Sequence, residues 1–496
     1  MILVANEKQE KAILSDGSEL IYVVKPNPPR GGMKHTYFTP DKQLAIQFFN
    51  EKKNAEDPKI HARLEKILGP YNPTLPQTKG GALGNSEQTA NYFVAIYCWP
   101  IATVSYPEYG IVCPAYPSNF KFGEDSVKPG VKLKLSGKDK KSTWFTSSTS
   151  KYLADKEKGN FQKMICLSIA LARAIRRLHS AGLAHTDLSG NNVLIDPTTG
   201  SCAVIDIDSL VVPGLFPPEV IGTRGYIAPE VLSTMELDFH DPAKNLPCVR
   251  TDLFALPVLL YEFFLKRHPL VGPKCHSEDP EEDDYLSFGP KALFIEHPLD
   301  KTNRPKDLYV TIDDLGPELS KLFMKAFVDG LHSPSKRPTA ASWERGLVRT
   351  WDLLQPCSNP KCPDGWFVCY DVKNPVCPFC GARVSATMHL KLKKTMKGKH
   401  GQWQTVGEIN LYDKMPLFLW HFLANNFPDE KATDRMMKAY IMYRHGEWYL
   451  VNKGLEGMLS PAGNLVPTGQ AVWLYDGATF LSCNHPDALL IEVIRG

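Results

Sequence analysis

A pair of acids around an apolar run constrains this chain more than any other sequence feature. Asp206 follows the run Val204-Ile205, and a polar segment that contains Asp187 and Asn192 precedes it. An acid at the end of an apolar strand is well placed to bind Mg²⁺, a hard ion that prefers oxygen ligands. Asp206 is therefore predicted to be a magnesium ligand, with the polar segment contributing to the same site.

Further motifs stand in a fixed order around this site, and together they resemble a eukaryotic-like protein kinase. They are His185-Thr186-Asp187-Leu188-Ser189-Gly190-Asn191-Asn192, Gly222-Thr223-Arg224-Gly225-Tyr226-Ile227-Ala228-Pro229-Glu230, Asp252 and Arg337. The resemblance implies that Asp187 orients the attacking hydroxyl, while Asn192 and Asp206 hold Mg²⁺ beside ATP. It also implies that Asp252 braces the catalytic loop and that Arg337 pairs with Glu230.

Thr223 bears on the acceptor, because the matching threonine of Ser/Thr kinases touches the catalytic aspartate. The resemblance therefore implies a protein substrate phosphorylated on serine or threonine. A small-molecule phosphotransferase is a competing interpretation. It fits less well, since residues 222–230 match a peptide-docking segment.

The phosphate-binding lysine is missing from its usual strand. Residues 44–49 resemble that strand but carry Gln47, a neutral amide, at the lysine position. Upstream, Gly31 and Gly32 resemble a degenerate glycine-rich loop, and Lys34 falls where the "with-no-lysine" kinases carry their relocated lysine. One hypothesis is that Lys34 contacts the phosphates. The alternative is that Lys34 is a solvated loop residue and Gln47 marks a pseudokinase that binds nucleotide and recruits partners as a scaffold.

Other candidate residues complete the nucleotide site. An acid on the helix predicted at 58–68 is expected to pair with the phosphate-binding lysine, and Glu65 is the candidate, with Glu56 behind it. Adenine is expected near Pro114, Ala115 and Tyr116, after the strand at 110–113. Asp208 replaces the glycine of the Asp-Phe-Gly motif and either adds a metal ligand or caps a turn.

A cysteine quartet predicts a zinc ribbon. Its members have knuckle spacing and are Cys357, Cys362, Cys377 and Cys380. Four thiolates at such spacing suit tetrahedral Zn²⁺. A redox pair with stray cysteines is the alternative, and Cys369 is expected to be a strand residue and not a ligand.

These features predict an α+β chain with a bilobal kinase-like fold, a zinc ribbon and a C-terminal β-sandwich. The expected parts are listed in chain order: N-lobe 1–117, C-lobe 118–355, zinc ribbon 356–385 and β-sandwich 386–496. Strand patterns near 447–453 and 467–477 resemble the late strands of forkhead-associated domains. That resemblance leaves open whether the sandwich binds phosphothreonine or only packs and docks, since fold alone does not give function.

Local patterns give further expectations. Strands are expected at 13–14, 20–24, 35–39, 44–49, 92–98, 110–113, 447–451, 470–475 and 489–493. Helices are expected at 58–68, 160–181, 251–266, 315–329 and 339–354. The acidic segment at 273–285 is expected to be a solvated loop.

Composition excludes several classes of protein. The net charge of +3 favours neither nucleic acid nor an anionic membrane as a partner. No apolar run is long enough to span a bilayer. Because most cysteines are scattered singly, a reducing cytoplasm is expected.

The order kinase, ribbon and β-module resembles bacterial kinases of the tellurite-resistance-associated stress systems. That resemblance implies two partners, a von Willebrand factor A-type protein and a metal-dependent phosphatase.

Overall fold

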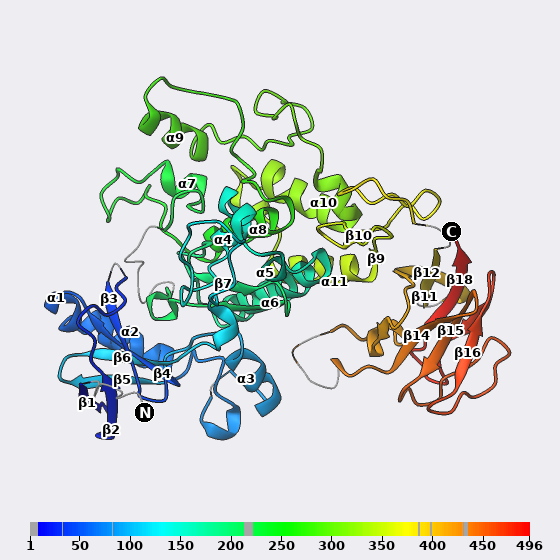
Figure 1. Cartoon of the computed structure of the whole chain (residues 1–496), viewed down its shortest axis with the longest axis horizontal. Coiled ribbons are helices and arrows are strands. Elements are labelled where there is room, and N and C mark those ends of the chain that lie inside the picture. The colour runs from blue at the N-terminus through cyan, green and yellow to red at the C-terminus, as the bar shows by residue number, and fades with distance from the viewer. Residues whose placement is uncertain are drawn as a thin grey trace.

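The computed structural model describes residues 8–31, 33–81, 83–212, 222–384, 387–396, 399–428, 430 and 435–496. Figure 1 shows three regions along the longest axis: an N-terminal group of strands, a central group of helices and a C-terminal group of strands. In the described part of the chain, none of the helices is both long and apolar enough to cross a membrane.

The N-terminal region is a closed antiparallel barrel in the order β1-β2-β3-β4-β6-β5. Its strands are β1 (Gln9–Leu14), β2 (Glu19–Val23), β3 (Lys34–Phe38), β4 (Leu44–Phe49), β5 (Ala102–Tyr106) and β6 (Gly110–Pro114). Alternate residues such as Ile46, Phe48 and Val112 point inward and are buried. The predicted strands at 44–49 and 110–113 are confirmed, whereas β5 was missed.

Three helices accompany the barrel: α1 (Lys52–Ala55), α2 (Pro58–Leu68) and α3 (Glu87–Val94). Helix α2 occupies its predicted range. Asp57 caps it by accepting a hydrogen bond from the Lys59 backbone N–H at 2.8 Å. Ile60, Leu64 and Ile67 recur at helical spacing and are buried. They pack α2 against the barrel and against the large core of the central region.

The predicted strand at 92–98 is wrong, because most of its first half belongs to α3. Ser86 caps this helix and accepts a hydrogen bond from the Thr89 N–H at 3.2 Å. Ala90 and Phe93 lie three residues apart and are buried, which is the period of a helix and not of a strand.

The central region is built mainly from helices around one large core. They are α4 (Thr143–Thr146), α5 (Asp155–Lys158), α6 (Phe161–Ser180), α7 (Pro229–Leu232), α8 (Val249–Leu265), α9 (Pro280–Phe288), α10 (Gly316–Met324) and α11 (Ala340–Asp352). Helix α6 confirms the prediction at 160–181, and its Leu167, Leu171 and Ile175 are fully buried. A two-stranded sheet, β7 (Val193–Asp196) with β8 (Ser201–Val204), completes the region and leads into Asp206.

The acidic segment at 273–285 is only partly a loop. Asp279 accepts hydrogen bonds from the N–H groups of Glu281 and Glu282, both at 2.9 Å, and α9 begins at Pro280. Acidic residues in the first turn favour a helix, because its N-terminus carries partial positive charge.

The C-terminal region contains three further sheets. Strands β9 (Leu354–Pro356) and β10 (Trp366–Val368) pair beside the cysteine quartet. One four-stranded sheet has the order β12-β11-β18-β17, with β11 (Met388–Met396), β12 (Lys399–Asn410), β17 (Thr479–Leu481) and β18 (Leu490–Arg495). The other has the order β13-β14-β15-β16, with β13 (Pro416–Leu417), β14 (Ala439–Arg444), β15 (Glu447–Asn452) and β16 (Ala471–Leu474). The two sheets contribute to one shared core.

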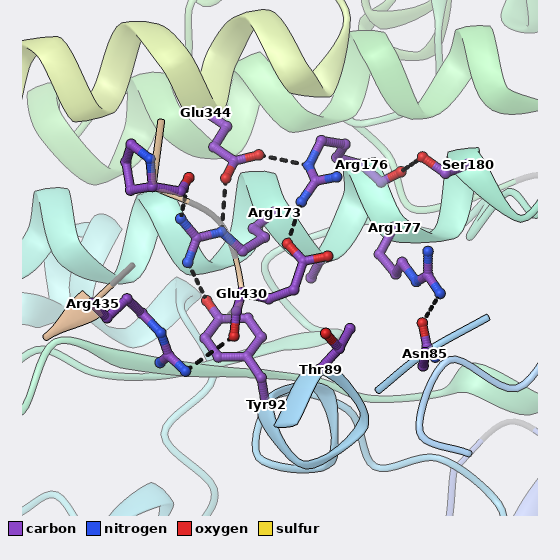
Figure 2. A network of polar contacts seen from close by, with 12 residues as sticks. Asn85, Thr89, Tyr92, Arg173, Arg176, Arg177, Ser180, Glu344, Glu430 and Arg435 are labelled. Carbon is purple, nitrogen blue, oxygen red and sulfur yellow. Dashed lines mark hydrogen bonds and ion pairs between the residues drawn. The ribbon is translucent and has the colours of Figure 1, made fainter. Parts of the chain in front are cut away.

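A buried ionic network joins the C-terminal region to the central helices (Figure 2). We call it the arginine cluster: Arg173 and Arg176 of α6, Glu344 of α11, and Glu430. Glu344 accepts hydrogen bonds from Arg173 at 2.7 Å and from Arg176 at 2.6 Å, and Arg176 also pairs with Glu430 at 2.7 Å. Each carboxylate therefore meets at least one guanidinium, and Glu430 is fixed against α6.

Candidate active site and metal centre

The predicted catalytic loop brings Asp187, Asn192 and Thr223 together. The Thr223 hydroxyl donates a hydrogen bond to Asp187 Oδ1 at 2.7 Å. The Asn192 side-chain amide donates to Asp187 Oδ2 and to the Asp187 backbone carbonyl, each at 2.8 Å. These bonds fix the Asp187 carboxylate from both sides and leave the Asn192 amide oxygen as the atom suited to a metal ion.

Asp252 braces this loop, as predicted. Its carboxylate accepts hydrogen bonds from the backbone N–H groups of His185 at 2.8 Å and Thr186 at 2.9 Å. His179 contacts the same carboxylate at 3.1 Å. Thr186 has a positive φ of 64°, a conformation that costs energy for a side-chain-bearing residue, so the loop depends on these bonds for its shape.

The predicted contact between Arg337 and Glu230 is confirmed. The guanidinium donates two hydrogen bonds to the carboxylate, at 2.8 and 2.7 Å. Arg337 also donates to the backbone carbonyls of Gly330 and Leu331. A bidentate pair of this kind is both strong and directional, so it fixes the end of the segment at 222–230.

Lys34 lies across the site from this loop and is the first residue of strand β3. Its ammonium contacts the Asp208 carboxylate and lies 3.7 Å from Asp206 Oδ1. Burial lowers the pKa of Lys34, but Asp208 and then Asp206 outweigh it, so the pKa lies above its usual value. Burial raises the pKa of Asp206, and the neighbouring Asp208 raises it further against the opposing effect of Lys34.

The strand register explains why Lys34, and not Gln47, reaches the acids. Lys34 pairs with Phe49 and Thr36 pairs with Gln47, so Lys34 lies two residues further along the same face. The Gln47 amide contacts the Thr36 hydroxyl at 3.5 Å. The amide therefore has a neighbour on the adjacent strand, whereas the Lys34 ammonium extends to Asp208.

The prediction that Glu65 pairs with this lysine is wrong. Glu65 lies on the exposed face of α2. Burial raises the pKa of Tyr109 to about 12, and the charge of Glu65 adds to this rise. No ion pair joins Glu65 to Lys34, both of which the structure describes. Glu56 pairs instead with Lys52 at 3.4 Å. Helical periodicity could not identify the partner of Lys34, because that partner, Asp208, comes from the other lobe.

The predicted adenine segment follows strand β6. Pro114 ends the strand, and the Ala115 N–H donates a hydrogen bond to the Gln43 carbonyl at 2.8 Å. Burial raises the pKa of Tyr116. Gly31 donates its N–H to the Lys34 carbonyl at 2.8 Å, which closes the turn before β3. Gly32 lies outside the described residues.

Sequence reasoning missed a second support for the catalytic loop. The Tyr226 hydroxyl donates a hydrogen bond to Glu262 of α8 at 2.5 Å. A Cβ on Gly190 would come within 2.7 Å of Thr143 Cγ2 and 2.9 Å of the same hydroxyl, so a larger residue there would displace these side chains. Burial raises the pKa of Glu262 to about 7. Only the position of Tyr226 within the motif at 222–230 could have signalled this contact.

The cysteine quartet forms a compact cluster, as the spacing predicts. The ligand atoms of Cys357, Cys362, Cys377 and Cys380 all lie within 4.8 Å of one another. Cys357 Sγ lies 3.5 Å from Cys380 Sγ, and Cys362 Sγ lies 3.9 Å from Cys377 Sγ. A Zn–S distance of about 2.3 Å places sulfurs roughly 3.8 Å apart in a tetrahedron, so these residues fit Zn²⁺.

Two further observations concern the cysteines. The Ala382 backbone N–H lowers the pKa of Cys380 to about 7, which favours the thiolate that binds metal. Cys369 is buried outside the quartet, directly after β10, and its N–H donates to the Leu353 carbonyl at 2.9 Å. It is therefore not a ligand of the cluster, as predicted, although it lies one residue beyond the strand.

The central region is similar to known proteins. Residues 145–343 match the protein kinase domain family. The chain is 30% identical over 143 residues to the probable serine/threonine-protein kinase RTK1 of Saccharomyces cerevisiae, which covers 26% of this chain and 21% of that protein. It is 24% identical over 173 residues to the probable serine/threonine-protein kinase SCO3848 of Streptomyces coelicolor. That alignment covers 34% of this chain and 21% of that protein.

Other matches extend this picture. The chain is 35% identical over 131 residues to the human anti-Muellerian hormone type-2 receptor, which covers 22% of each. The Toxoplasma gondii rhoptry antigen kinase domain aligns in structure with 14% identity and a TM-score of 0.39, over 69% of this chain and 86% of that chain. The chain spans about a fifth of the length of these curated relatives. The match to the protein kinase domain family is confined to residues 145–343, and the barrel that carries Lys34 lies outside the matched segment.

Proposed function

We propose that this chain is an ATP- and Mg²⁺-dependent Ser/Thr protein kinase in which Lys34 contacts the phosphates. The observation that carries the proposal is the position of the Lys34 ammonium, which contacts Asp208 and lies 3.7 Å from Asp206. A solvated loop lysine would be exposed, whereas Lys34 is 8% exposed. A cation at the metal-binding carboxylates is where phosphoryl transfer requires one.

The roles of the other residues follow from their contacts. Asp187 would accept the proton of the substrate hydroxyl as the phosphoryl group passes to that oxygen and ADP leaves. Thr223 and Asn192 hold the carboxylate in place for this task. Mg²⁺ would be held by Asn192 and Asp206, and it would neutralise charge on the phosphates. Adenine would lie near Pro114, Ala115 and Tyr116, with Gly31 and Gly32 covering the phosphates.

Incubation with labelled ATP, Mg²⁺ and a generic protein substrate tests the proposal. Asp187→Ala should lower phosphate transfer at least about 100-fold, because a general base contributes that much. Lys34→Ala should lower it strongly and weaken ATP binding. Lys156→Ala is the matched control, since Lys156 pairs with Asp125 on the exposed surface and should leave transfer unchanged.

Two outcomes would overturn the proposal. Equal labelling by the wild type and Asp187→Ala would favour a pseudokinase scaffold, the reading that Gln47 supports. Unchanged ATP affinity and turnover in Lys34→Ala would remove the role of Lys34 while leaving the kinase intact.

The division of the chain into domains and its biological role are also proposals. We propose an N-lobe at 1–117, a C-lobe at 118–355, a zinc ribbon at 356–385 and a forkhead-associated-like β-sandwich at 386–496. The two C-terminal sheets with a shared core support the sandwich. A role in a tellurite-resistance-associated stress system of the cytoplasm, with a von Willebrand factor A-type protein and a metal-dependent phosphatase as partners, rests on sequence resemblance. Co-purification of either protein with the full chain would test it.

A further inference from the structure

Asp208 occupies a position where kinases of the resembled type have a glycine, and it pairs with a buried lysine. The Lys34 side chain is 9% exposed and the Asp208 side chain 8% exposed. The two residues come from different lobes, since Lys34 begins β3 and Asp208 follows β8. Their contact therefore joins the two lobes beside the catalytic loop.

The charges around this pair are unequal. We call Lys34, Asp206 and Asp208 the lysine cluster. It contains one ammonium against two carboxylates, so one negative charge is in excess when all three are ionised. Asp208 is buried, whereas the Asp206 side chain is 46% exposed. A buried carboxylate is stable only when a cation or hydrogen bonds compensate it. This cluster therefore has the capacity for a divalent cation.

The geometry shows that one cation can serve both acids that follow β8. The Lys34 ammonium already contacts Asp208 and lies 3.7 Å from Asp206 Oδ1. Asp206 has a positive φ of 63°, and the carboxylates at positions 206 and 208 both approach the Lys34 ammonium. Two carboxylates that converge on one positive charge are a suitable ligand pair for a hard divalent ion.

We propose that Asp208 exchanges partners, holding the Lys34 ammonium before nucleotide binds and then ligating the divalent cation that accompanies ATP. The exchange would release Lys34 to the phosphates. Asp208 would thus be a metal ligand, and it would also control when Lys34 is released to the phosphates. Metal binding and phosphate binding would therefore depend on each other. The inference rests on the proposed function.

The competing interpretation is that the pair is a structural lock between the lobes. In that case removing Asp208 would loosen the site for metal and nucleotide alike. The exchange predicts opposite effects, because Asp208 competes with the phosphates for Lys34 but cooperates with them through the metal.

Asp208→Asn in the full chain separates these interpretations without any turnover. Mn²⁺ replaces Mg²⁺, so that electron paramagnetic resonance can measure free metal, and a non-hydrolysable ATP analogue serves as the nucleotide. The affinity for Mn²⁺ in the presence of the analogue should fall at least about 10-fold, the scale seen when metal-site contacts are removed. The affinity for the analogue without metal should stay the same or rise, because Lys34 has lost a competitor.

Asp125→Asn is the matched control, since Asp125 pairs with Lys156 in an exposed lysine–carboxylate contact. It should change neither affinity. An unchanged Mn²⁺ affinity in Asp208→Asn would overturn the proposal, and so would loss of analogue binding in the absence of metal. Both results are independent of whether the chain transfers phosphate, so a failed kinase assay would not be mistaken for a failure of the exchange.

Discussion

The lysine cluster and the arginine cluster each contain a buried ion pair, Lys34–Asp208 in one and Arg173–Glu344 in the other, yet they differ in charge balance. In the arginine cluster, Glu344 meets two guanidinium groups and Glu430 meets one. In the lysine cluster, one ammonium faces two carboxylates, those of Asp206 and Asp208. A balanced buried network leaves no charge for a ligand, so its role is structural. An unbalanced one is stable enough to fold but suited to bind a cation.

The location of each cluster agrees with this difference. The arginine cluster lies between α6, α11 and Glu430, and Arg173 is 5% exposed there. Arg173 also donates a hydrogen bond to the Tyr92 hydroxyl of α3 at 2.9 Å (Figure 2). The lysine cluster lies beside the catalytic loop, where the excess charge can be used. Charge balance thus separates the residues that hold regions together from those proposed to bind ligands.

The cysteine quartet is the least balanced of the three charged groups, because its four thiolates would carry only negative charge without a metal. Removal of zinc by a chelator should give the largest effect, since structural zinc contributes about 10 kcal/mol or more in small modules. The expected result is rapid proteolysis within 357–383 together with a lower Tm. Metal analysis should find one zinc per chain in the wild type and in Cys369→Ala, but none in Cys377→Ala. Full zinc retention by Cys377→Ala would contradict the assignment.

Breaking the balanced cluster should give the next largest effect. Glu344→Gln should lower the free energy of unfolding by about 3 kcal/mol, because Arg173 and Arg176 would lose their shared carboxylate. Urea unfolding followed by fluorescence measures the loss. Glu318→Gln is the control: its exposed pair with Arg349 should contribute under about 1 kcal/mol. Equal losses in the two variants would show that the arginine cluster is not structural.

Reducing the charge excess should have the smallest effect on stability. Asp208→Asn should change the free energy of unfolding by no more than about 1 kcal/mol in metal-free buffer, because Lys34 keeps Asp206 nearby while one excess negative charge is removed. The same urea experiment measures it. A loss as large as that of Glu344→Gln would mean that both clusters are structural, and the distinction between them would fail.

The sequence predicted those parts of the structure that depend on local periodicity or on short motifs. Helices α2 and α6 were found because their apolar residues recur at helical spacing over several turns. The contacts of Asp252, Thr223 and Arg337 followed from ordered motifs. The cysteine quartet followed from its spacing, since two knuckles must meet to bind one metal.

Long-range contacts could not be predicted in the same way. Asp208 was named only as a possible ligand or turn cap, because nothing local indicates that it faces Lys34 across the lobes. The aromatic and aliphatic residues at 92–98 suggested a strand, whereas the Ser86 cap starts a helix there. Strand β5 was missed although Thr103 and Val104 are β-branched, a signal that favours strands. The arginine cluster joins residues more than 160 positions apart and left no local signal.

The join between the kinase domain and the C-terminal sheets has a practical consequence for work on separate fragments. Asn410 donates hydrogen bonds to the carbonyls of Leu353 at 2.7 Å and Cys369 at 2.6 Å, and His421 contacts Asp352 at 3.0 Å. Trp351 and Trp366 pack against both the central and the C-terminal cores. A fragment cut near residue 355 would expose Trp351 and free the Leu353 carbonyl from Asn410. Such a fragment is therefore expected to aggregate more readily than the intact chain during expression.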